Sequence, residues 1–155
     1  MCYKERNNIM ATSTIWGAAQ DVQHLCRGVR SVSTASHGGL LVAEQYAKKY
    51  IPKEILEHTP FEYGSYQFEE DCEINIPLFF QPKLVIDLVN AFYPRKTPEE
   101  KFESLKNHFK YTYRGIQQWF PKYMEQYSWQ AEQFKFFAMS VLNYNAEQIE
   151  ELLRA

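Results

Sequence analysis

A run of small polar residues is the feature of this chain that most constrains its fold. The run reads Ser33-Thr34-Ala35-Ser36-His37-Gly38-Gly39 and follows a predicted strand. Glycine adopts positive φ without steric cost, and a hydroxyl placed before it can bond to a turning backbone. We therefore expect the chain to turn sharply at Gly38 and Gly39 and to hold His37 beside the turn.

The residues on either side of this run predict a small antiparallel sheet. Residues 20–26 and 29–34 are predicted strands joined by a turn at Arg27-Gly28, because short β-favouring runs separated by a glycine turn are typical of hairpins. Residues 40–42 are a candidate third strand, which would make a meander with the His37 loop at its edge.

The remainder of the chain is mainly helical in its pattern. Helices are expected over 43–49, 52–58 and 82–92, with a loop over 60–65. Thr97 followed by Pro98, and Asn145 followed by Gln148, are predicted to begin two further helices, because these residue types are favoured in the first turn. The predicted core stripes of the helices are Leu84, Val85, Leu88, Val89 and Phe92, then Phe102, Leu105, Phe109 and Tyr113, then Ile116, Trp119, Phe120, Tyr123 and Tyr127, and finally Phe134, Phe137, Val141 and Leu142.

These elements predict an α+β fold. A small N-terminal antiparallel β unit of two to four strands would pack on a mainly helical C-terminal half. We expect a flexible tail over 1–12 and a single domain over 13–155, with a motif-bearing part over 13–80 and a helical part over 81–155. A length of 155 residues suits one domain.

A second polar stretch, Glu69-Glu70-Asp71-Cys72-Glu73, has two structural interpretations. Cys72, Ile76 and Phe79 are spaced as on one face of a helix, which would place the acids in its first turn. Pro77 conflicts with this helix because proline kinks a helix interior. A strand over 72–76 is the alternative.

Composition limits the classes of partner and the compartment. The net charge is −2, so no global field attracts nucleic acid or an anionic membrane. Residues 53–75 carry seven acids against one base, and residues 95–135 carry eight bases against five acids. Three cysteines without a C-x-x-C pair, and the lack of any long apolar run, favour a cytoplasmic protein.

The two polar stretches supply the candidate catalytic residues. His37 with carboxylates of the acidic stretch has the chemistry of a divalent metal site or of an acid–base pair, although no metal is required by the sequence. Cys72 with His37 is a candidate nucleophile and base. A purely structural role is the competing interpretation: His37 bonding its own turn, acids facing water and Cys72 packing as a small apolar residue. The predicted catalytic residues are His37, Glu70, Asp71 and Cys72, and the predicted binding residues are Ser33, Thr34, Ser36, Gly38, Gly39, Trp16 and Glu69.

The motif residues resemble a small domain of unknown function found in bacteriophage and plasmid proteins. The resemblance rests on Trp16-Gly17 with Gln20, on Gly28-Val29 leading into the run over 32–39, and on the acidic stretch over 69–73. That domain has a T/S-P-W-G-x-x-Q opening, a G-I/V-x-x-V-S-T-A-S-H-G-G core and a Y-E-E-D-C turn. The resemblance covers about residues 16–80, roughly half of the chain, with Ile15 in place of the proline and Phe68 in place of the tyrosine. The helical half from residue 82 onward has no recognised counterpart.

The resemblance implies an accessory protein of a mobile genetic element. We expect a protein-binding or counter-defence factor that acts on a host or phage protein through the acidic stretch or a tyrosine-rich helical face. The alternative is a small metal-dependent or acid–base hydrolase using His37 and the carboxylates over 69–73. Bases mixed with aromatic residues over 102–137 also fit single-stranded nucleic acid, but helical spacing assigns most of these rings to the core, so nucleic acid is the less favoured partner. No membrane partner is expected, and a homo-oligomer is compatible with the sequence.

Overall fold

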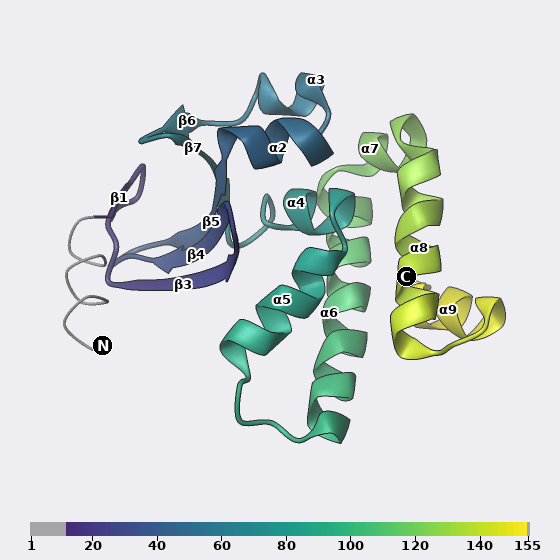
Figure 1. Cartoon of the computed structure of the whole chain (residues 1–155). Helices are drawn as coiled ribbons and strands as arrows, with labels where there is room; N and C mark the ends of the chain where they lie inside the picture. Colours follow the sequence, from purple (N-terminus) through teal and green to yellow (C-terminus); the bar gives the residue numbers. More distant parts are fainter. Residues whose placement is uncertain (1–11, 155) are drawn as a thin grey trace. The chain divides into compact units, whose positions relative to one another are not determined.

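The computed structural model describes residues 12–154, so the predicted tail lies outside the described residues except for Thr12. The chain divides between Ile74 and Asn75 into two compact units (Figure 1). The first holds an antiparallel sheet and the second is helical, which confirms the α+β class. The expectation of a single domain over 13–155 stays a prediction.

The first unit contains a five-stranded antiparallel sheet and a separate hairpin. Strand order in the sheet is β3-β4-β5-β7-β6. The sheet strands are β3 (Asp21–Cys26), β4 (Val29–Ser33), β5 (Gly38–Ala43), β6 (Phe61–Glu62) and β7 (Ser65–Glu69), and the hairpin strands are β1 (Ser13–Thr14) and β2 (Gly17–Ala18). The predicted meander is confirmed as β3, β4 and β5.

The sheet extends beyond the predicted strands because the expected loop over 60–65 is a hairpin. Glu62 pairs with Ser65, and the two residues between them, Tyr63 and Gly64, have φ angles of 54° and 79°. A two-residue turn with both φ angles positive matches the twist of the flanking strands. Tyrosine is an unusual residue for such a turn, which explains why the sequence did not reveal β6 and β7.

Two short helices follow β5 in the first unit. α2 (Glu44–Tyr50) and α3 (Lys53–Leu56) confirm the helices expected over 43–49 and 52–58, and Pro52 is the N-cap residue of α3. α2 packs against β5 and β7 (Figure 1). Elsewhere in this unit, Ala19, Val32 and Leu41 form a buried cluster against which Trp16 and Val22 pack.

The second unit is a helical assembly in which the long helix α6 contacts the other five (Figure 1). Its helices are α4 (Asn75–Phe80), α5 (Lys83–Phe92), α6 (Pro98–Trp119), α7 (Pro121–Gln126), α8 (Ser128–Leu142) and α9 (Ala146–Leu153). Both predicted helix starts are confirmed: the Thr97 hydroxyl accepts a bond from the Glu100 N–H, and Asn145 forms a reciprocal capping box with Gln148. Within residues 12–154, every helix is too short or too polar to span a bilayer.

Stacked and edge-to-face aromatic rings fill the core of this unit. The ring of Phe134 lies 5.7 Å from that of Phe79 and 5.8 Å from that of Phe109, measured between centroids. Two predicted core residues are instead exposed, Phe92 by 42% and Trp119 by 54%. Each is the last residue of its helix.

Candidate functional site

The run over 33–39 spans the end of β4, the connecting loop over 34–37 and the start of β5. Ser33 ends β4, and the loop that follows is closed by Thr34 and His37. The Thr34 N–H and hydroxyl both donate to the His37 carbonyl at 2.7 Å, and the Thr34 hydroxyl accepts from the His37 N–H at 3.1 Å. The hydroxyl of Thr34 therefore holds the His37 loop closed, as residues of this type commonly do in turns.

The expected turn at the two glycines is wrong, because Gly38 and Gly39 lie in strand β5. They pair with Ser33 and Val32, and the positive-φ glycines of the described chain are found at other positions. Because they have no side chain, the neighbouring backbone can approach β5 closely at these two positions. A Cβ atom on Gly39 would lie 2.0 Å from the Phe68 carbonyl oxygen, and one on Gly38 would lie 2.7 Å from the Val32 carbonyl oxygen. These positions exclude a side chain on steric grounds.

Trp16 lies over Gly39 and completes this close packing. Its Cη2 atom would be 2.8 Å from a Cβ on Gly39. The hairpin that carries Trp16 is tied to the sheet by Gln67, whose Oε1 accepts from the Ile15 N–H at 2.9 Å and whose Nε2 donates to the Glu62 carbonyl at 3.1 Å. Gln67 is fully buried in β7. We did not identify it from the sequence, where the available signal was a lone amide between aromatic strand residues.

The acidic stretch forms a turn between β7 and α4, so both the predicted helical first turn and the alternative strand over 72–76 are wrong. Glu69 is the last residue of β7, and α4 begins only at Asn75. The Ile74 N–H donates to the Glu69 carbonyl at 2.8 Å and closes the turn. Pro77 occupies the first turn of α4, where its missing N–H costs no hydrogen bond.

The structure brings the two polar stretches together. Gly39 pairs with Glu69 across β5 and β7, and the Glu70 N–H donates to the Gly38 carbonyl at 2.9 Å. Because Gly38 follows His37 directly, the loop and the acidic turn lie side by side. We call the resulting surface the motif edge, and it consists of Ser36, His37, Glu69, Glu70 and Asp71. All of these except the half-buried Glu69 are exposed.

The carboxylates of the motif edge are close enough to share a cation. One ligand oxygen from each of Glu69, Glu70 and Asp71 lies within 4.8 Å of the others. Oxygen ligands of this kind suit Ca²⁺ or Mg²⁺. Among residues 12–154, neither His37 nor Cys72 belongs to this cluster. The combination of His37 with the carboxylates as metal ligands stays a prediction.

The surroundings of Cys72 oppose a nucleophilic role. Burial raises the pKa of the Cys72 thiol above its ordinary value, and the negative charges of Glu73, Glu69 and Asp71 raise it further. The thiolate is the nucleophilic form, and a reactive cysteine normally has a lowered pKa. Cys72 therefore lacks the electropositive environment that activates a thiol.

A separate hollow of about 360 Å³ lies elsewhere in the first unit. It is lined by Lys48, Ile51, Lys53, Leu56, Glu57 and Tyr66. These residues belong to α2, α3, β7 and the segments that flank the two helices, so none of the predicted site residues lines this hollow.

Comparison with known proteins gives one family. Residues 9–140 match the model of a domain of unknown function (DUF7007). The match extends well past residue 80, so the helical half, which had no recognised counterpart, belongs to the same family domain as far as residue 140. Neither the curated proteins nor the solved structures contain a match to this chain.

Replacing Gly39 tests the close packing under the motif edge. We expect Gly39→Ala to lower the free energy of unfolding by about 3 kcal/mol, because the added methyl overlaps backbone that cannot move without separating β5 from β7. Ser36→Ala in the exposed loop is the control, with an expected change below about 0.5 kcal/mol. Chemical unfolding followed by circular dichroism measures both. Equal stabilities would show that the glycine is not sterically required.

The raised pKa of the Cys72 thiol predicts slow alkylation. In a Cys2→Ser/Cys26→Ser background, the pH midpoint for reaction with iodoacetamide should lie above that of cysteine in an unstructured peptide, because less thiolate is present at any given pH. Glu73→Gln removes one of the charges that raise the pKa, so the reaction at pH 8 should become faster. Glu62→Gln should leave the rate unchanged. A midpoint below the peptide value would contradict this description.

Proposed function

The chain belongs to the DUF7007 family, and we propose that it is a non-enzymatic binding protein that docks a basic surface of another protein on its motif edge. The observation that carries this proposal is the bond from the Glu70 N–H to the Gly38 carbonyl at 2.9 Å. It joins two segments about thirty residues apart into one surface. A surface fixed before binding loses less conformational entropy when a partner docks.

The charge of the motif edge supports a basic partner. Three carboxylates gather within 4.8 Å, and within the described chain no lysine or arginine forms an ion pair with Glu69, Glu70 or Asp71. Their charge is therefore available to a partner. Complementary charges across an interface speed association and favour one partner over another.

The surroundings of the other motif residues favour binding over catalysis. Several loop residues have structural roles: Thr34 closes the His37 loop, and the glycines allow β5 to approach Trp16 and Phe68. Burial and the nearby acids raise the pKa of the Cys72 thiol, which opposes formation of the nucleophilic thiolate. The exposed remainder of the motif is a polar surface without an activated nucleophile.

The biological setting of the proposal comes from the motif itself. The resemblance of the two polar stretches to domains in phage and plasmid proteins favours an accessory or counter-defence role. The partner would then be a host or phage protein in the cytoplasm with a cluster of lysine or arginine side chains.

Charge reversal on the motif edge tests this function. The immobilised protein is cross-linked to partners from a bacterial lysate, and recovered proteins are quantified by mass spectrometry. Glu70→Lys/Asp71→Lys should reduce recovery of the specific partner about tenfold or more, because two attractive contacts become repulsive. Both side chains are exposed, so the fold should be retained.

The matched control carries the same change of charge at other exposed acids. Glu62→Lys/Glu125→Lys alters the net charge equally and leaves the motif edge intact. It should recover the partner as the unaltered protein does. Equal recovery by the two double variants, whether high or low, would contradict a binding role for the motif edge.

A further inference from the structure

The hollow beside α2 and α3 has the size of a small-molecule site. Its volume is about 360 Å³, and ligand pockets in proteins commonly measure about 300–1,000 Å³. All of its lining residues belong to the first unit. We call it the α2–α3 hollow, and its lining consists of Lys48, Ile51, Lys53, Leu56, Glu57 and Tyr66.

Two nearly buried aliphatic side chains form the floor of the α2–α3 hollow. Ile51 is 4% exposed and Leu56 is 6% exposed. Backbone bonds hold both residues in place: the Ile51 N–H donates to the Ala47 carbonyl at 2.8 Å, and the Leu56 N–H donates to the Pro52 carbonyl at 3.2 Å. An apolar floor that is fixed before binding loses little conformational entropy when a ligand packs on it.

Tyr66 supplies an aromatic wall. It lies in β7, and the ring of Phe61 packs against it from the paired strand β6, with the ring centroids 4.8 Å apart and the ring planes inclined by 54°. Tyr66 is half-buried, so part of its side chain stays accessible. Aromatic rings favour stacked or edge-on contacts with one another at centroid distances of about 4.5–7 Å. The wall therefore favours a ligand that contains a planar ring.

Two lysines contribute ammonium groups to the lining of the hollow. Lys48 bonds Glu44 at 2.6 Å. The pKa of the Lys48 ammonium is raised, chiefly by this bond and the charge of Glu44 and with a smaller contribution from Tyr66, so Lys48 is cationic at neutral pH. Lys53, by contrast, is exposed and forms no ion pair with any residue over 12–154. Its ammonium group can therefore bond a carboxylate of a ligand, a strong charge-assisted contact.

The acids around the hollow limit the charge of the ligand. Glu57 contributes to the same lining, and Glu44 already balances Lys48. A ligand with two or more negative charges, such as a phosphate ester, would bring its second charge close to these carboxylates, and like charges placed together are unfavourable. A single carboxylate bonded to Lys53 avoids this repulsion.

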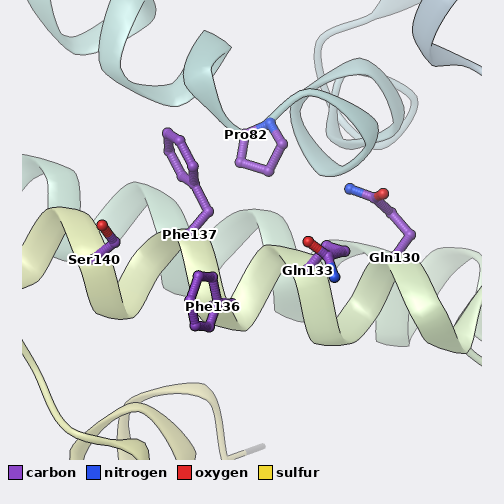
Figure 2. Close-up of a pocket in the computed structure, with 6 residues that line it drawn as sticks. All are labelled: Pro82, Gln130, Gln133, Phe136, Phe137 and Ser140. Carbon is purple, nitrogen blue, oxygen red and sulfur yellow. The ribbon is translucent and has the colours of Figure 1, made fainter.

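Two hollows in the second unit lack this combination of features. One of about 220 Å³ lies between α8 and Pro82, and Figure 2 shows its lining, in which no side chain is charged: Pro82, Gln130, Gln133, Phe136, Phe137 and Ser140. The other, of about 260 Å³, is lined in part by Glu132, Lys135 and Glu150, and there Lys135 bonds both acids. Neither lining contains a lysine that is free to bond a carboxylate.

We propose that the α2–α3 hollow binds a small aromatic monocarboxylate. The ring of the ligand packs on Ile51 and Leu56 and against the ring of Tyr66. Its carboxylate bonds the ammonium group of Lys53, with the positive charge of Lys48 nearby. This site is separate from the motif edge, and its ligand is a small molecule rather than a protein.

Titration with cinnamate, followed by two-dimensional amide NMR of the full chain, tests the site. Cinnamate combines one planar ring with one carboxylate. It should cause saturable shifts of the amide signals over 48–57 and at Tyr66, with a dissociation constant of about 1 mM or below. Cinnamamide has the same shape without the charge and should bind at least about fivefold more weakly, because the bond to Lys53 is no longer charge-assisted.

Substitutions of exposed residues test the roles of the charged groups. Lys53→Gln should weaken cinnamate binding at least about fivefold. Lys49→Gln is the matched control, because it removes the same charge from an exposed position of α2 that does not line the hollow, and it should bind as the unaltered protein does. Glu57→Gln removes the nearby negative charge and should tighten binding. The remaining amide signals should be unchanged in all three variants.

The proposal is overturned if cinnamate at up to about 10 mM causes no saturable shift at the lining residues, if cinnamamide binds as tightly, or if Lys53→Gln binds as tightly as Lys49→Gln. The Glu70→Lys/Asp71→Lys variant of the motif edge should bind cinnamate normally. Failure of this site and failure of the proposed function are therefore distinguishable.

Discussion

The close approach of backbone and indole ring at Gly39 is the contact on which the motif-bearing unit depends. With no side chain at this position, the Phe68 carbonyl and the Trp16 ring both approach β5. That approach fixes the pairing of β5 with β7, because Gly39 lies opposite Glu69. The pairing then places the Glu70 N–H at the Gly38 carbonyl. The motif edge is thus a consequence of packing beneath it.

Features encoded by neighbouring residues were predictable from the sequence. The hairpin around Gly28 and the helix starts at Thr97 and Asn145 depend on contacts within a few residues, and all three are observed. The hairpin at Tyr63-Gly64 was missed because tyrosine rarely adopts positive φ. The start of α4 was misplaced because the spacing of Cys72, Ile76 and Phe79 was interpreted as one helix face. That made Pro77 an interior residue, whereas it lies in the first turn, where proline is tolerated.

The residues of the candidate site could be identified from the sequence, but their arrangement in space could not be predicted from it. Both polar stretches were singled out, yet their adjacency arises from the pairing of β5 with β7, a long-range contact that no local pattern specifies. The glycines were interpreted as turn residues because glycine is common in turns. The requirement for glycine at position 39 comes instead from Phe68 and Trp16, which are distant in the chain and leave no room for a side chain. Gln67, which holds the Trp16 hairpin, acts through the same tertiary contacts.

Hydrogen exchange at the Glu70 amide, measured residue by residue by NMR, tests most directly whether the two motif segments form one fixed surface. The side chain of Glu70 is exposed, but its amide bonds the Gly38 carbonyl, so exchange should be slow and similar to that of Phe68 in β7. Ser36 in the exposed loop provides the fast reference. Exchange at Glu70 as rapid as at Ser36 would show that the His37 loop and the acidic turn are not held together, and would contradict this account.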